Sequence, residues 1–117
     1  MKKFVNAVDQ VEKEMLRGFL KANPGIVELP CGAVLVRKEK KEGKVAIISG
    51  GGSGHEPAFG GYIGKGMLDA VAAGNIYTSP AADHIYEGIK SIATDKGVLV
   101  RTRVSEIREL GRATQGV

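Results

Sequence analysis

The sequence contains no tryptophan, only one cysteine and few aromatic residues. Because Cys31 has no second cysteine to pair with, an internal disulfide and a cysteine-rich metal site are excluded, and a reducing compartment is favoured. No apolar stretch is long enough to cross a membrane, and acidic residues interrupt the segment after Met1-Lys2-Lys3, which argues against a signal peptide. We therefore expect a cytoplasmic protein with no membrane segment.

A stripe of basic side chains alternating with aromatic ones is also missing, so we expect no nucleic-acid partner. The net charge of +4 is modest, and lysines and glutamates alternate in residues 37–44, as on a solvated surface. With 117 residues the chain is long enough for one domain with a real core. Its 17 glycines suit an α/β fold with functional loops.

Residues 44–57, KVAIISGGGSGHEP, are the most informative stretch. The apolar run at 45–48 predicts a strand buried on both faces, as in a parallel sheet. The glycines at 50–52 predict a sharp turn that brings backbone N–H groups close to a ligand. Since ligands bind at the carboxyl ends of strands in open α/β sheets, a binding site is expected here. His55 is the first side chain in this loop suited to proton transfer near neutral pH.

The rest of the chain alternates between predicted helices and strands. Val11, Met15 and Phe19 recur at helical spacing and predict an amphipathic helix over 8–22. Ser79 is expected to cap a second helix. The other predicted elements are strands at 34–36, 68–73 and 97–100, a compact irregular segment at 58–66, and that second helix at 80–93. This alternation predicts an α/β fold with a mostly parallel twisted sheet flanked by helices.

The final segment, residues 101–117, differs in composition from the rest. It holds four of the six arginines and none of the eleven lysines. This switch suggests a different origin for the tail, whereas the simpler interpretation is a short terminal helix at 105–110. We therefore divide the chain into residues 1–100 and a divergent arginine-rich tail, 101–117, that is truncated or out of register.

Three common glycine motifs do not fit the loop. A dinucleotide fingerprint that starts at Gly50 or Gly52 meets His55 or Pro57 where glycine is required. A Walker A motif and a nucleophile elbow fail for similar reasons. What remains is a polar ligand at a glycine loop with one histidine, or a tight turn beside a structural histidine.

Three stretches together resemble one family. GGGSGHEP at 50–57, GYIGKGML at 61–68 and GNIYTSP at 74–80 are similar, in order and spacing, to dihydroxyacetone (glycerone) kinases. The similarity is to the substrate-binding K subunit or domain, and it extends over about residues 1–100, including the amino-terminal segment. It implies that the chain is part of a larger K-type domain.

The resemblance implies a kinase that phosphorylates dihydroxyacetone or a similar short ketose or aldose. Gly51, Gly52, Ser53, Gly54 and His55 match the substrate-binding loop, and His55 matches the histidine that assists proton transfer. The family keeps ATP, or ADP recharged by a phosphotransferase-system phosphocarrier, with Mg²⁺ on a separate L subunit or fused domain. No cofactor or metal is therefore expected in this chain, and a homodimer is expected.

Other side chains near these motifs have two interpretations each. The Glu56 carboxylate could act at the site or hold the loop by accepting backbone N–H groups. Thr78 could line the pocket. Lys65 could attract an anion, although a solvated side chain is the simpler interpretation. His84 is expected to be exposed on its helix.

The sequence departs from the family after residue 100. The family's lysine and aspartate that contact substrate fall on Arg103 and Arg108, and a guanidinium cannot act as a base near neutral pH. The histidine that binds the substrate carbonyl covalently belongs to a second half of the family's chain and matches neither His55 nor His84. We therefore expect an incomplete K subunit that is inactive alone.

Three functions remain open at this point. The first is the substrate-binding part of a dihydroxyacetone kinase. The second is a non-catalytic dihydroxyacetone-binding regulator or coactivator, as in family members without the covalent histidine. The third is an α/β domain whose glycine loop is structural or binds an unrelated phosphate.

Overall fold

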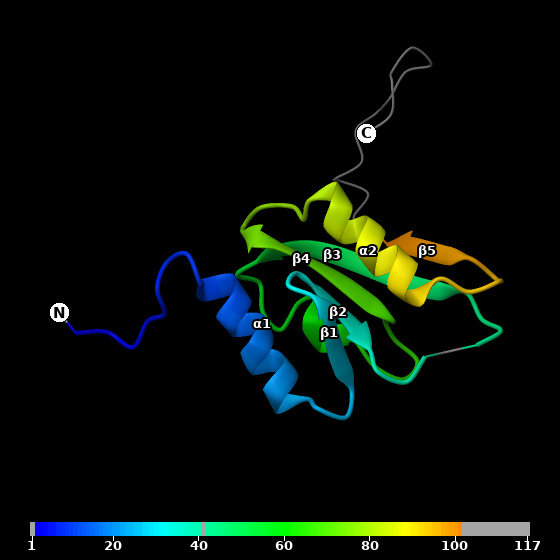
Figure 1. The fold of residues 1–117 in the computed structure, drawn as a ribbon, viewed down its shortest axis with the longest axis horizontal. Coiled ribbons are helices and arrows are strands. Elements are labelled where there is room, and N and C mark those ends of the chain that lie inside the picture. The colour runs from blue at the N-terminus through cyan, green and yellow to red at the C-terminus, as the bar shows by residue number, and fades with distance from the viewer. Residues whose placement is uncertain (1, 41, 102–117) are drawn as a thin grey trace, which may run out of the picture.

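The computed structural model describes residues 2–40 and 42–101. Figure 1 shows that the strands form one sheet and that the helices lie against it. In chain order these are α1 (Val11–Ala22), β1 (Val27–Cys31), β2 (Val34–Arg37), β3 (Ala46–Ser53), the 3-10 helix η1 (Gly60–Tyr62), β4 (Ala70–Ile76), α2 (Ala82–Ile92) and β5 (Val98–Arg101). Among the described residues, neither helix has the length and apolar character needed to cross a membrane.

The strands form one mixed sheet in the order β1-β2-β4-β3-β5. β3 lies between β4 and β5 and is parallel to both, as the alternation of elements predicts. β1 and β2 form an antiparallel hairpin, and β2 also pairs with β4 in antiparallel fashion. The α/β class with flanking helices is confirmed, and the hairpin strand β1 is an addition that the sequence analysis does not contain.

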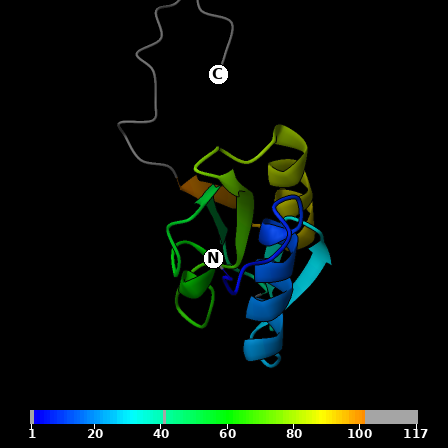
Figure 2. The same cartoon turned by 90° about the vertical axis from the view of Figure 1, so that its left-hand side faces the viewer.

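Both faces of the sheet are buried at β2, whose four residues are all buried although alternate side chains point to opposite sides. In β2, Val34 and Val36 belong to one apolar cluster with Ile92 of α2. Leu35, between them, belongs to a second cluster with Leu16 of α1. α1 and α2 therefore cover opposite faces, as Figures 1 and 2 show from two sides.

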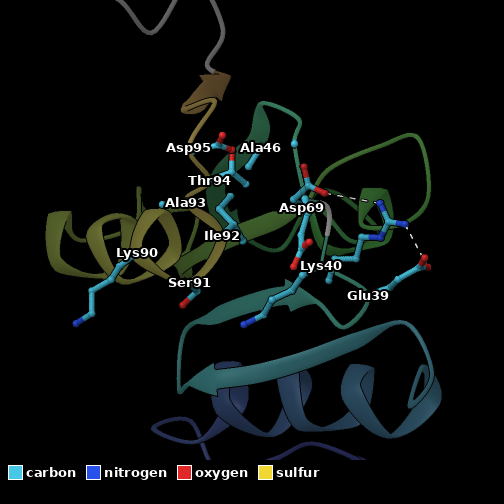
Figure 3. Close-up of a pocket in the computed structure, with 13 residues that line it drawn as sticks. Glu39, Lys40, Ala46, Asp69, Lys90, Ser91, Ile92, Ala93, Thr94 and Asp95 are labelled. Atoms are coloured by element: carbon cyan, nitrogen blue, oxygen red, sulfur yellow. Dashed lines mark hydrogen bonds and ion pairs between the residues drawn. The ribbon is translucent and has the colours of Figure 1, made fainter.

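A buried ion pair lies near the start of β3. Arg37 Nη1 is 3.7 Å from Asp69 Oδ1, and the two side chains are only 6% and 7% exposed. The other Asp69 oxygen accepts the Ile47 N–H at 2.9 Å, which ties β4 to β3. The pair borders a cavity of about 610 Å³. Lys90 also lines this cavity, but its side chain points away from it (Figure 3). This end of the sheet is therefore held by charge pairing as well as by apolar packing.

The predicted turn at residues 50–52 is wrong, because β3 continues through the glycines to Ser53. Gly50 and Gly52 pair in register with Ala72 and Gly74 of β4. A Cβ on Gly50 would lie 2.6 Å from the Ala72 carbonyl oxygen, so the strand can pass here only without a side chain. Glycine inside a strand thus marks a close approach of a neighbouring backbone.

The start of α2 also differs from the prediction. Its N-cap is Ala81, with no side-chain cap, so the expected capping role of Ser79 is wrong. Residues 78–80 instead pass tightly over β4, where a Cβ on Gly74 would lie 2.0 Å from the Thr78 carbonyl oxygen. The helix can begin only after this crossing.

The remaining predicted elements are present with shifted ends. α1 begins at Val11 rather than at residue 8, and the strand predicted at 68–73 occupies Ala70–Ile76. The compact segment at 58–66 contains η1. The helix predicted at 105–110 lies outside the described residues.

Candidate functional site

Ser53 connects the carboxyl ends of β3 and β4. Its side chain is buried, and its hydroxyl donates a hydrogen bond to the Gly74 carbonyl oxygen at 2.7 Å. The Ser53 carbonyl in turn accepts the Tyr77 N–H at 2.8 Å. Both polar groups of Ser53 therefore fix the chain at the edge where a ligand is expected.

Gly51 and Gly52 have no room for a side chain. A Cβ on Gly51 would lie 2.1 Å from Phe59 Cε2, and one on Gly52 would lie 2.6 Å from the Thr78 backbone nitrogen. Phe59 and Thr78 belong to segments that follow β3 and β4 and return to lie against the glycines. The close packing of these segments explains both glycines without a ligand.

Gly54 begins the turn after β3. Its φ of +109° is a conformation that glycine adopts readily and other residues rarely do. Its N–H points at the Glu56 carboxylate, with distances of 3.2 and 3.0 Å to the two oxygens. Glu56 therefore holds the loop by accepting a backbone N–H, which confirms one of the two interpretations of this residue.

His55 is exposed on this fixed turn. Its carbonyl accepts the Ala58 N–H at 3.1 Å. The backbone is therefore anchored by hydrogen bonds at Gly54, just before the histidine, and at the His55 carbonyl after its side chain. Its imidazole meets the Tyr77 ring edge-to-face, with 5.3 Å between ring centroids and 66° between planes. An accessible imidazole on a rigid turn can exchange hydrogen bonds or a proton with a bound molecule.

The five predicted site residues divide between two environments. Gly51, Gly52 and Ser53 line a mainly apolar cavity of about 330 Å³ between β3, residues 56–60 and α1. Gly54 and His55 lie beyond that cavity on the exposed turn. The five consecutive residues thus run from the cavity to the surface, and of these five only Gly54 and His55 face open solvent.

The other candidates have varied surroundings. Lys65 is exposed, as expected. Thr78 is exposed and its hydroxyl donates to the Ile76 carbonyl at 3.2 Å. His84 is half-buried beside a separate cavity of about 420 Å³, so the prediction that it is exposed is wrong. Arg103 and Arg108 lie outside the described residues.

Within the part of the chain that the structure describes, the acidic and histidine side chains near this end of the sheet do not form a metal site. In residues 2–40 and 42–101, no three or more histidine, cysteine, aspartate or glutamate side chains gather where they could hold a metal ion. The described residues therefore offer His55, backbone groups and the Glu56 carboxylate as the chemistry of this site.

The sequence analysis missed Tyr77 and Phe59 as neighbours of the loop. Tyr77 stands inside the GNIYTSP stretch, so its proximity to the glycine loop could have been suspected. Its contact with His55 depends on a left-handed backbone, φ +53°, for which the sequence carries no signal.

Comparison with known proteins gives a consistent result. The Dak1 domain model matches residues 17–103. The chain is 48% identical over 101 residues to the Listeria innocua PTS-dependent dihydroxyacetone kinase 1, dihydroxyacetone-binding subunit DhaK, covering 86% of this chain and 31% of that protein. It is 36% identical over 113 residues to the DhaKLM operon coactivator DhaQ of Lactococcus lactis, covering 95% and 34%.

Comparison with solved structures points to the same family as the sequence comparison. The crystal structure of the dihydroxyacetone kinase from C. freundii with AMP-PNP and Mg²⁺ is similar, with a TM-score of 0.75 and 35% identity, over 85% of this chain and 19% of that one. The chain spans about a third of the length of the curated relatives described above.

A second and shorter match concerns the end of the chain. The model of the DNA gyrase C-terminal domain, β-propeller, matches residues 92–117 and overlaps the Dak1 match at 92–103. The Dak1 match alone extends over well more than half of the 117 residues. The chain belongs to the Dak1 domain family.

Proposed function

We propose that this chain is the substrate-binding part of a dihydroxyacetone (glycerone) kinase that acts on dihydroxyacetone or a similar short ketose or aldose. The observation that carries the proposal is an exposed imidazole, His55, on a turn whose backbone is fixed at the carboxyl end of β3. The family relatives named for binding dihydroxyacetone support the choice of ligand.

The chemistry of the ligand suits this turn. A short polyhydroxy ketone offers hydroxyls and a carbonyl, which an imidazole can meet as donor or acceptor. In the proposed reaction, His55 hydrogen-bonds a substrate hydroxyl and takes its proton as the phosphoryl group is transferred. Ser53, Gly54 and Glu56 contribute by holding the histidine in place, because a rigid site loses less entropy on binding.

The phosphoryl donor would come from outside this chain. We propose a nucleotide-binding L subunit or fused domain that carries ATP, or ADP served by a phosphotransferase-system phosphocarrier, together with Mg²⁺; bound there, the nucleotide and metal supply the phosphoryl group and charge stabilisation. The chain alone would then be inactive. A homodimer and a cytoplasmic location belong to the same proposal; the free Cys31 is compatible with that location.

The division of the chain at residue 100 is also a proposal. It is supported by the change from lysine to arginine after residue 100. Removal of residues 102–117 tests it: the free energy of unfolding and the NMR signals of His55 should stay unchanged. Loss of folding in the shortened chain would contradict the division.

The coactivator function remains the second candidate. It is favoured by the 36% identity to DhaQ, which extends over 95% of this chain. Both candidates predict dihydroxyacetone binding, but only the kinase predicts phosphoryl transfer once the rest of a K-type domain and a nucleotide-binding partner subunit are both supplied. That assay separates the two.

The first experiment is a titration of dihydroxyacetone into the chain, followed by calorimetry and NMR. Saturable binding is expected in the wild type, loss of binding in His55→Ala, and unchanged binding in the control His84→Ala, whose imidazole lies beside another cavity. Equal binding by His55→Ala, or no binding by a folded wild type, would contradict the proposal. Binding of inorganic phosphate instead would favour an unrelated phosphate site.

A further inference from the structure

Tyr77 occupies a backbone conformation that suits glycine better than tyrosine. Its φ is +53°, and it is the one non-glycine residue with positive φ in the described part of the chain. The Thr78 N–H donates to the Asn75 carbonyl at 3.0 Å, so Tyr77 is the third residue of a tight turn. Glycine or asparagine is the usual residue where this position has positive φ.

Burial does not compensate for this strain. Tyr77 is 72% exposed, so it gains little from removal of apolar surface from water. Tyr77 contributes only backbone groups to the turn, and glycine would provide these at lower cost. Strained residues of this kind gather at functional sites, where the surrounding structure holds them in place.

The Tyr77 ring is placed against the turn that carries His55. Its contact with the imidazole is edge-to-face at 5.3 Å between centroids, a favourable geometry for two rings. A Cβ on Gly54 would lie 2.9 Å from Tyr77 Cε1, so the ring also lies directly over the backbone before His55. The Tyr77 backbone, from which the ring projects, is itself anchored because its N–H donates a hydrogen bond to the Ser53 carbonyl.

We propose that Tyr77 is a positioning residue: its ring limits rotation of the His55 side chain and so orients the imidazole for substrate. The proposal rests on the function proposed above and adds a specific residue to it. The ring, and not the hydroxyl, performs this role, since the contacts described for Tyr77 are made by its ring and its backbone.

Three substitutions separate the ring from the backbone. Tyr77→Phe keeps the ring, whereas Tyr77→Gly and Tyr77→Asn remove it and still accept positive φ. Tyr86→Ala is the matched control, because Tyr86 is an exposed tyrosine of α2 whose ring contacts Lys90. Circular dichroism is used to confirm that each variant folds.

The first measurement is the set of NMR couplings across the His55 Cα–Cβ bond, which report the side-chain rotamer independently of the Tyr77 ring current and require no ligand. The couplings should report one preferred rotamer in the wild type, Tyr77→Phe and Tyr86→Ala, and should average toward those of an unstructured histidine in Tyr77→Gly and Tyr77→Asn. An unchanged His55 rotamer in folded Tyr77→Gly would overturn the proposal.

The second measurement is dihydroxyacetone affinity. We expect Tyr77→Phe to bind within about twofold of the wild type and Tyr77→Gly to bind roughly tenfold more weakly, because misplaced site groups lose affinity steeply. Wild-type affinity in Tyr77→Gly would overturn the positioning role. If the wild type itself does not bind, the proposed function fails, and the NMR result alone decides whether Tyr77 positions His55.

Discussion

Replacement of Gly52 by alanine tests whether the glycines of β3 are required by packing. The added Cβ would lie 2.6 Å from the Thr78 nitrogen and 2.9 Å from two Tyr77 backbone atoms. These are backbone atoms, so no side-chain rotation can relieve the overlap. The Tyr77–Thr78 segment is also anchored by hydrogen bonds from its N–H groups to Ser53 and Asn75.

The expected cost follows from two opposing effects. Overpacking at a rigid position costs about 1–3 kcal/mol, and the anchored backbone places this site in the upper half of that range. Alanine also restricts the unfolded chain, which returns about 0.4–1 kcal/mol. Gly52→Ala should therefore lower the free energy of unfolding by about 2 kcal/mol, or the melting temperature by roughly 10 °C for a domain of this size.

Urea denaturation followed by circular dichroism measures this change. The control is Gly18→Ala in α1, where nothing lies within 4 Å of the new Cβ. There alanine should stabilise the helix by up to about 1 kcal/mol through its higher helix propensity. The same chemical change thus has opposite signs at the two positions. A Gly52→Ala protein within about 0.5 kcal/mol of the wild type would refute the packing argument, since surface substitutions without consequence fall in that range.

Two further predictions concern the two ends of β3. Ser53→Ala removes the hydrogen bond to Gly74 and leaves a carbonyl without that donor, so unfolding free energy should fall by about 1–2 kcal/mol with an unchanged denaturant slope; an unchanged midpoint would contradict this. Asp69→Ala leaves the buried Arg37 with the exposed Glu39 as its only ionic partner among the described residues and removes the acceptor of the Ile47 N–H, so it should cost about 3–5 kcal/mol in thermal unfolding. Asp69→Leu combined with Arg37→Met removes both buried charges and should recover part of that loss, because the Ile47 N–H still lacks its acceptor. A double variant no more stable than Asp69→Ala would argue against charge burial as the cause.

The fold could be predicted where the signal is local. The apolar run Val34-Leu35-Val36 predicts a strand, and each of its residues is buried in β2. β1 was missed because Pro30 lies within it and proline disfavours a strand interior. Its position at the edge of the sheet makes proline acceptable, and edge position is a property of the whole sheet that the sequence does not reveal.

The candidate site follows the same rule. Glu56 and the N–H that it accepts are two residues apart, and that contact could be predicted. The reason for Gly51 and Gly52 could not, because the atoms that exclude their side chains come from Phe59 and Thr78. A run of glycines is compatible with a turn, a ligand cradle or a close crossing of backbones, and only the distant segments distinguish them.

Some groups of the proposed substrate site lie within the described residues, and others would have to come from elsewhere. The residues proposed to hold His55 in place are Ser53, Gly54 and Tyr77, and all three lie within the described residues. The lysine and aspartate positions implied by the family resemblance fall beyond residue 101. One side of the proposed substrate site is thus fixed by the fold itself. Dihydroxyacetone affinity should therefore depend on His55 and Tyr77 even in this chain, while phosphoryl transfer should require groups that another part or partner supplies.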